Sequence, residues 1–146
     1  MSGCRRSTKR RRGIIGVVSG YPPTHSIGQC ALVPLIDVTF SERIKPDQLR
    51  TLGELLSEVV PRAVDCPEDP FVGPPAMGDL EIRFHRKGAL DVGELSVVVE
   101  VRTKRFESRV QDAQQRAETI RRGLSTLSIG PIGVWLVLLD GAWTQD

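Results

Sequence analysis

The segment PLIDVTF, residues 34–40, predicts the strand that opens a β-α-β unit. Its β-branched residues favour extended backbone. Pro46-Asp47 then forms a typical first helical turn, with the acid at the positive end of the helix. The apolar residues that follow at helical spacing are Leu49, Leu52, Leu56, Val59 and Ala63. We expect this helix to end near residues 65–67.

A second strand closes the unit. After a loop rich in proline and glycine, LEIRFH at residues 80–85 alternates apolar and polar residues, as a strand with one solvated face does. The same order of elements then returns, with strands predicted at residues 95–102 and 134–139. Between these two strands, apolar residues recur at helical spacing at Val110, Ala113, Ala117, Ile120, Leu124 and Leu127.

These two β-α-β units predict an α/β fold: one four-stranded sheet with two helices on one face, the halves related by a pseudo-twofold axis. Residues 134–139 are apolar at every position, which is typical of a strand buried on both sides. An uncovered apolar sheet face marks an interface, so we expect a homo-oligomer with the sheets packed inward. The alternative is that the loop at residues 67–79 folds over the sheet.

The composition is that of one soluble domain. The chain has 146 residues, of which 40% are hydrophobic, and no apolar run is long enough to span a membrane. We expect neither a disulfide framework nor a metal site nor a cofactor, and a reducing cytoplasm fits best. The cysteines and histidines, none of them in a Cys-x-x-Cys pair, are Cys4, Cys30, Cys66, His25 and His85.

Charge divides the chain at residue 34. Residues 1–33 carry six basic side chains and no acidic one, whereas residues 34–146 carry 14 bases and 18 acids. The first segment is interrupted by glycine and proline and has no lasting period, so it is interpreted as a disordered basic extension. The acidic body lacks a dense basic face, and we therefore expect no nucleic-acid partner.

A proline that leads directly into the first strand of two successive β-α-β units resembles the tautomerase superfamily, in which each chain begins with a catalytic proline. The resemblance covers residues 34–146 and extends to the segment RTKRFESR, residues 102–109. This segment is similar to the arginine-bearing turn of cis-3-chloroacrylic acid dehalogenase, malonate semialdehyde decarboxylase and 5-carboxymethyl-2-hydroxymuconate isomerase. The resemblance, which includes 4-oxalocrotonate tautomerase, implies a cofactor-independent isomerase that assembles as a homotrimer.

The implied catalyst is Pro34, acting on a small carboxylate-bearing keto or enol acid. A free N-terminal proline is a secondary amine, and its pKa falls toward neutrality beside arginines in a partly desolvated site. It can then move a proton as a general base. The resemblance gives Arg102 and Arg105 the task of holding the carboxylate and stabilising the enolate. The structural alternatives are that Pro34 only begins an edge strand and that Arg102 and Arg105 are solvated charges.

Further candidates lie near the strand ends. His85-Arg86 is similar to a pair in malonate semialdehyde decarboxylase. Asp140 stands where the dehalogenase and decarboxylase carry a glutamate near the active site, which activates water in the dehalogenase. In a hydratase, dehalogenase or decarboxylase of the same superfamily, Asp140 would activate water. Val137 replaces the dehalogenase's tyrosine, which argues against hydrolytic dehalogenation. Trp143 is a candidate wall of the substrate pocket. The alternatives are that His85 is a surface histidine, that Asp140 is a turn residue before Gly141, and that Trp143 packs the chain end.

Pro34 is internal in this sequence, and its nitrogen is therefore an amide without a basic lone pair. Val33 suggests an explanation, since a GTG codon can start translation and is otherwise read as valine. Residues 1–33 would then lie upstream of the true start. The alternative is a non-catalytic oligomeric binding module whose proline stays blocked.

Overall fold

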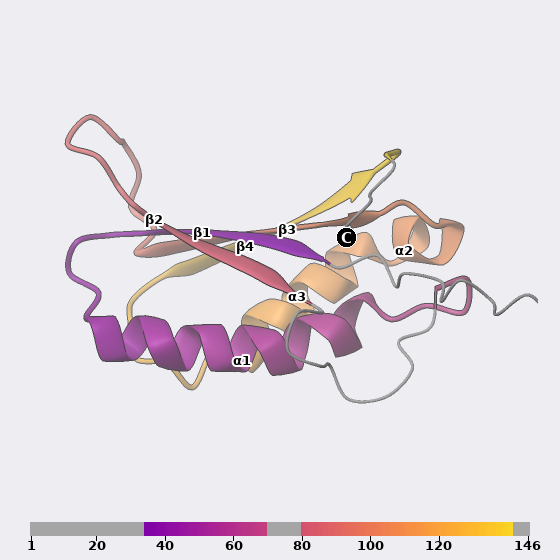
Figure 1. Ribbon diagram of the computed structural model, residues 1–146, viewed down its shortest axis with the longest axis horizontal. Coiled ribbons are helices and arrows are strands. Elements are labelled where there is room, and N and C mark those ends of the chain that lie inside the picture. The colour runs from indigo at the N-terminus through magenta and orange to yellow at the C-terminus, as the bar shows by residue number, and fades with distance from the viewer. Residues whose placement is uncertain (1–33, 70–79, 142–146) are drawn as a thin grey trace, which may run out of the picture.

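The computed structural model describes residues 34–69 and 80–141, which form one mixed sheet with helices on one face (Figure 1). The predicted α/β fold class is confirmed. In chain order the elements are β1 Leu35–Phe40, α1 Pro46–Val64, β2 Glu81–Arg86, β3 Val97–Lys104, α2 Glu107–Gln111, α3 Ala113–Gly123 and β4 Ile132–Leu139.

The sheet has the order β2-β1-β3-β4. Strands β1 and β2 are parallel, as are β3 and β4, whereas the two central strands β1 and β3 are antiparallel. Each half is thus a β-α-β unit, and the two units meet at the centre in opposite directions. This arrangement is the one expected for two halves related by a pseudo-twofold axis.

The core lies between the sheet and the helices. Residues of β1 and β3 alternate between this buried face and the opposite face, which we call the open face. Among the described residues, the buried members of the core cluster all fall between Ile36 and Ile129. Its fully buried members include Ile36, Val38, Leu52, Leu56, Val60, Val97, Val99, Val101, Ile120 and Leu124.

The helix predicted in the second half is divided in two. Asp112 separates α2 from α3 with a non-helical backbone (φ −124°, ψ 24°), and its carboxylate accepts a hydrogen bond from Arg116 Nε. The same guanidinium donates to the carbonyl oxygens of Ala63 (2.9 Å) and Asp65 (2.6 Å) at the end of α1. Apolar periodicity did not reveal the break, because Arg116 makes these contacts with a distant part of the chain.

Strand β4 lies at the edge of the sheet. Trp135 and Leu139, which face away from the helices, are 67% and 44% exposed. Within the described residues, helices therefore cover β4 on one face only. The alternative cover, the loop at residues 67–79, lies largely outside the described residues. No helix of the described ranges has the length and apolar character needed to cross a membrane.

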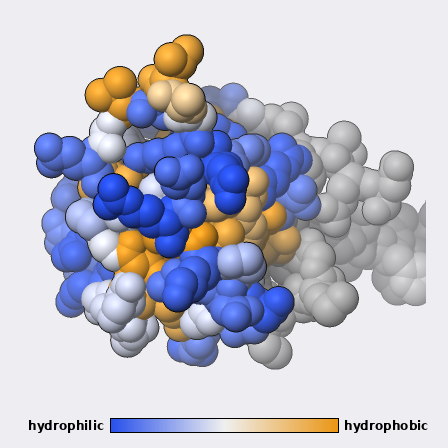
Figure 2. Space-filling view, turned by 90° about the vertical axis from the view of Figure 1, so that its left-hand side faces the viewer, coloured by the Kyte–Doolittle hydropathy of each residue, from blue (hydrophilic) through white to orange (hydrophobic). Residues whose placement is uncertain are grey.

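The connection between β2 and β3, residues 87–96, projects beyond the sheet on the side away from α1 (Figure 1). Figure 2 shows apolar surface at the top of the molecule, where the tip of this connection lies. Leu90 and Val92 belong to it and are 93% and 99% exposed.

Candidate site at the Pro34 end of the sheet

Pro34 lies at the end of the sheet where β1 and β2 begin and where β3 and β4 finish. The residue is buried, and its carbonyl oxygen accepts a hydrogen bond from the Glu81 backbone N–H over 3.4 Å. The pairing of Leu35 with Arg102 places Thr103 opposite Pro34 in the antiparallel register. Chain alternation directs both side chains toward the helices, as it does for Ile36.

Arg102 lies inside β3, two residues before its end. Its side chain is on the open face, where the guanidinium reaches Asp37 Oδ2 (2.5 Å) and Glu100 Oε1 (2.7 Å). The guanidinium is therefore already paired with two carboxylates of the protein. A substrate carboxylate that binds Arg102 has either to displace Asp37 or Glu100 or to bind alongside them.

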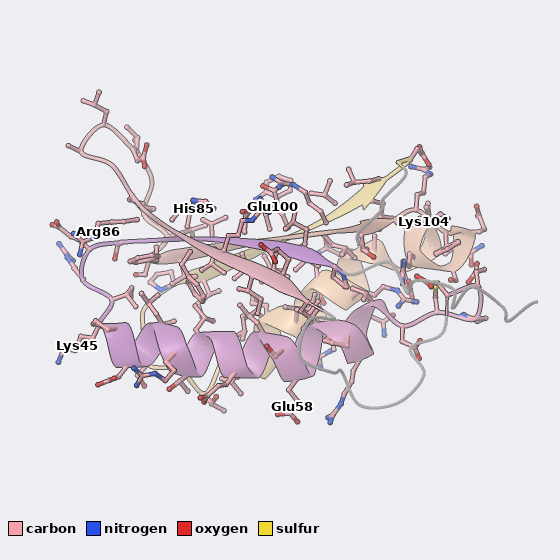
Figure 3. All side chains as sticks on the ribbon, viewed as in Figure 1. Lys45, Glu58, His85, Arg86, Glu100 and Lys104 are labelled. Atoms are coloured by element: carbon pink, nitrogen blue, oxygen red, sulfur yellow. The ribbon has the colours of Figure 1, made fainter. Side chains whose placement is uncertain are left out.

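Asp37 is the centre of this open-face network. Its Oδ1 lies 2.9 Å from His85 Nε2, across the parallel pair of β1 and β2. The pKa of Asp37 is lowered, chiefly by the hydrogen bond from His85 and also by the charge of Arg102, while desolvation opposes the shift. Figure 3 shows His85 and Glu100 on the side of the sheet away from α1.

Arg105 differs from Arg102 in its surroundings. It follows the end of β3, is exposed, and is held through its backbone N–H, which donates to the Leu139 carbonyl oxygen (3.0 Å). Within the described ranges its guanidinium makes no ion pair or hydrogen bond. The register of β3 with β4 also places Arg105 next to Asp140, so the structure brings these two candidates to the same sheet end as Pro34.

His85 and Arg86 lie at the other end of the sheet, beyond the reach of Pro34 in the same chain. Because β2 runs parallel to β1, these residues pair with Thr39 and Phe40 at the far end of β1, roughly 16 Å from Pro34 at the usual strand rise. Figure 3 shows the labelled His85 and Arg86 toward one end of the sheet and the labelled Lys104 toward the other. The expectation that His85 and Arg86 line one site with Pro34 is therefore not met within a single chain. Trp143 lies outside the described residues.

Arg109 is a key residue of this sheet end that sequence reasoning missed. Its side chain is 2% exposed and donates to the carbonyl oxygens of Val64 (2.7 Å) and Lys104 (3.0 Å) and to Asp69 Oδ2 (3.2 Å). It thus joins the end of α1, the end of β3 and the turn at residues 66–69. The sequence contains no local signal of its distant partners.

The neighbouring turn is fixed in a similar way by Glu68. Its carboxylate accepts hydrogen bonds from the Ser108 backbone N–H (3.1 Å) and hydroxyl (2.6 Å) at the start of α2. These two bonds lower the pKa of Glu68 to about 2, and the bond from the hydroxyl has the larger effect. Among the described residues, no group of three or more His, Cys, Asp or Glu side chains is placed to hold a metal ion.

Comparison with known proteins agrees with this architecture. No protein-family model and no curated protein sequence matches the chain. Solved structures do match: a fused 4-OT wild-type symmetric trimer has a TM-score of 0.52 and 14% identity, over 72% of this chain and 85% of that one. MIF2 of Leishmania major gives 0.51 and 13%, over 77% and 94% of the two chains.

FG41 malonate semialdehyde decarboxylase inhibited by 3-bromopropiolate gives a TM-score of 0.50 and 15% identity, over 77% of this chain and 88% of that one. The three proteins are tautomerase-superfamily members. The chain therefore has the tautomerase-superfamily fold, and the resemblance stated from the sequence is confirmed at the level of the fold.

Proposed function

We propose that this protein is a tautomerase that moves a proton between carbon and oxygen of a small carboxylate-bearing keto or enol acid. Pro34 is the general base when it is the N-terminal residue. One observation supports this assignment above the others: Pro34 immediately precedes the central strand β1 and is buried at one end of the sheet, in a fold shared with a malonate semialdehyde decarboxylase and a 4-OT.

The proposal requires the removal or absence of residues 1–33. As an amide, the Pro34 nitrogen has no lone pair for a proton, whereas a secondary amine in a buried, cation-rich position titrates near neutrality. Among the described residues, the buried core residues all lie at or after Ile36. We therefore expect a chain that begins at Pro34 to keep this interior.

Arg105 is best placed to bind the substrate carboxylate, since its guanidinium is exposed and has no ion-pair partner within residues 34–69 and 80–141. Arg102 contributes positive charge beside Leu35 and favours the neutral form of the nearby amine. Arg105 then binds the substrate, while Arg102 acts mainly on the pKa of the Pro34 amine.

A decarboxylase or hydratase is the second candidate of the same fold. Asp140 supports it, because this acid follows β4 directly beside Arg105 at the Pro34 end of the sheet. In that reaction Pro34 stays protonated and Asp140 activates water. A saturated or decarboxylated product would distinguish it from an isomerase. A non-catalytic binding module remains the alternative for the chain in which Pro34 is blocked.

We also propose that the protein acts as a homo-oligomer, with a trimer as the specific model, in a reducing cytoplasm. The exposed Trp135 and Leu139 on the open face support assembly, and one structural relative is a symmetric trimer. His85 and Arg86 stay substrate-binding candidates only through a neighbouring copy, because in their own chain they lie at the end opposite Pro34.

The test compares three proteins on phenylenolpyruvate and 2-hydroxymuconate: the 146-residue chain, the chain that begins at Pro34, and the shorter chain with Pro34→Ala. We expect activity from the second protein alone, since only it carries a secondary amine. Thermal melting serves as the control for folding and should give closely similar curves for all three. Equal activity in all three proteins would show that Pro34 only begins a strand.

A further inference from the structure

Thr103 carries a buried hydroxyl group that has no partner in the described part of the chain. The residue is 4% exposed, and its Oγ1 makes no hydrogen bond within residues 34–69 and 80–141. Leaving a buried hydroxyl unpaired is costly, and native proteins pair most such groups. Valine would fill nearly the same space on a strand without this cost. The hydroxyl therefore calls for an explanation beyond packing.

The sheet register places this hydroxyl beside Pro34. Leu35 pairs with Arg102, so the next pair in the antiparallel register is Pro34 with Thr103, and both side chains face the helices. Side chains directly opposite each other in such a pair have Cβ atoms about 4.5–5.5 Å apart. The unpaired oxygen consequently adjoins the ring of the residue that the proposed function makes the base.

We propose that Thr103 is a positioning residue for Pro34, and that its Oγ1 accepts a hydrogen bond from the protonated amine in the chain that begins at Pro34. This inference rests on the proposed function in that it needs a free amine. As an internal residue Pro34 has no N–H to donate, which accounts for the unpaired hydroxyl in the 146-residue chain. A free secondary ammonium has two N–H donors, and the threonine oxygen has two lone pairs.

The hydrogen bond has two consequences. It fixes the direction of the amine relative to the substrate, which lowers the cost of reaching the reactive geometry. It also favours the charged form, so that the pKa of the amine stays near neutrality and does not fall further under the influence of the arginines. A base whose pKa lies near the working pH is the most effective one.

The test uses Thr103→Val, Thr103→Ser and, as the matched control, Thr39→Val, which makes the same change on the open face at the far end of β1. Each is prepared in the 146-residue chain and in the chain that begins at Pro34. The pKa of the Pro34 amine is measured by nitrogen NMR with labelled proline in the shorter chain. Melting temperatures are measured in both chains, and kcat/KM is measured against pH in the shorter one.

We expect Thr103→Val to lower the pKa of the amine by roughly one unit and kcat/KM by roughly tenfold. Thr103→Ser should recover most of both, and Thr39→Val should leave the pKa at its wild-type value. Thr103→Val should raise the melting temperature of the 146-residue chain by roughly 4–8 °C, because it removes an unpaired buried hydroxyl there. It should give no such rise in the shorter chain, where the hydroxyl is paired.

An unchanged or raised pKa in Thr103→Val, or an equal rise in melting temperature in both chains, would overturn the assignment. These readouts do not depend on turnover. If the shorter wild-type chain is inert on every acid tried, the proposed function fails, while the pKa and melting data still report on the hydrogen bond. If that chain is active and Thr103→Val changes neither its kcat/KM nor the pKa, the role of Thr103 alone is refuted.

Discussion

Arg109 Nε donates a 2.7 Å hydrogen bond to the Val64 carbonyl oxygen, joining the start of the second helical region to the end of α1. The same guanidinium binds Lys104 and Asp69 while remaining 2% exposed. This buried cation thus links α1, β3 and the turn at residues 66–69 at the Pro34 end of the sheet.

Replacing Arg109 with methionine should lower the free energy of unfolding by roughly 3–5 kcal/mol, because Asp69 and two carbonyl oxygens lose their shared donor. Urea unfolding followed by circular dichroism measures the change. Arg121→Met, at an exposed position of α3, is the matched control and should change stability by less than about 0.5 kcal/mol. Equal effects of the two substitutions would contradict the anchoring role of Arg109.

Acid should weaken the fold through Glu68. Its pKa in the folded protein is about 2, below the ordinary value of 4.5. The carboxylate interactions therefore stabilise fully above pH 4.5 and are lost as the pH falls toward 2. In Glu68→Gln, the melting temperature should decline less steeply over this interval than in the wild type. Glu54→Gln, at an exposed position of α1, should keep the wild-type slope, and a wild-type slope in Glu68→Gln would contradict the prediction.

Arg102→Ala and Arg105→Ala should each remove roughly 2–4 kcal/mol of transition-state stabilisation in the chain that begins at Pro34. We expect Arg105→Ala to act mainly through substrate binding, because Arg105 has no described carboxylate partner. Arg102→Ala should also shift the pH profile, because it removes charge near the base. The measurement is kcat/KM against pH, with Arg50→Ala on α1 as the control. The arginine assignment is wrong if both variants retain wild-type kcat/KM.

The open face should lie in a subunit interface. Val137 is on this face of β4, between the exposed Trp135 and Leu139, so Val137→Lys should place a charge inside the contact and dissociate the assembly. Light scattering at micromolar concentration measures the mass. Gln115→Lys, at an exposed position of α3, should leave the assembly intact. A monomeric wild-type protein would exclude the interface.

The order of the strands and helical regions could be predicted from the sequence, whereas the division between α2 and α3 could not. The β-branched residues of 34–40 predict β1. Pro46 begins α1 in the structure as predicted, and the helix ends before Asp65. Such signals are local, since side-chain alternation and helical spacing depend on neighbours within a few residues. The two β-α-β units and their single sheet could therefore be predicted before any contact was known.

Which side chains meet depends on the tertiary structure. Antiparallel pairing of β1 with β3 brings Thr103 opposite Pro34, and parallel pairing of β1 with β2 carries His85 to the far end of the sheet. Arg109 and Arg116 find carbonyl oxygens at the end of α1, and the contact of Arg116 accompanies the break between α2 and α3. These partners are set by strand order and by packing across the whole core, and no local pattern of residues encodes such long-range pairings.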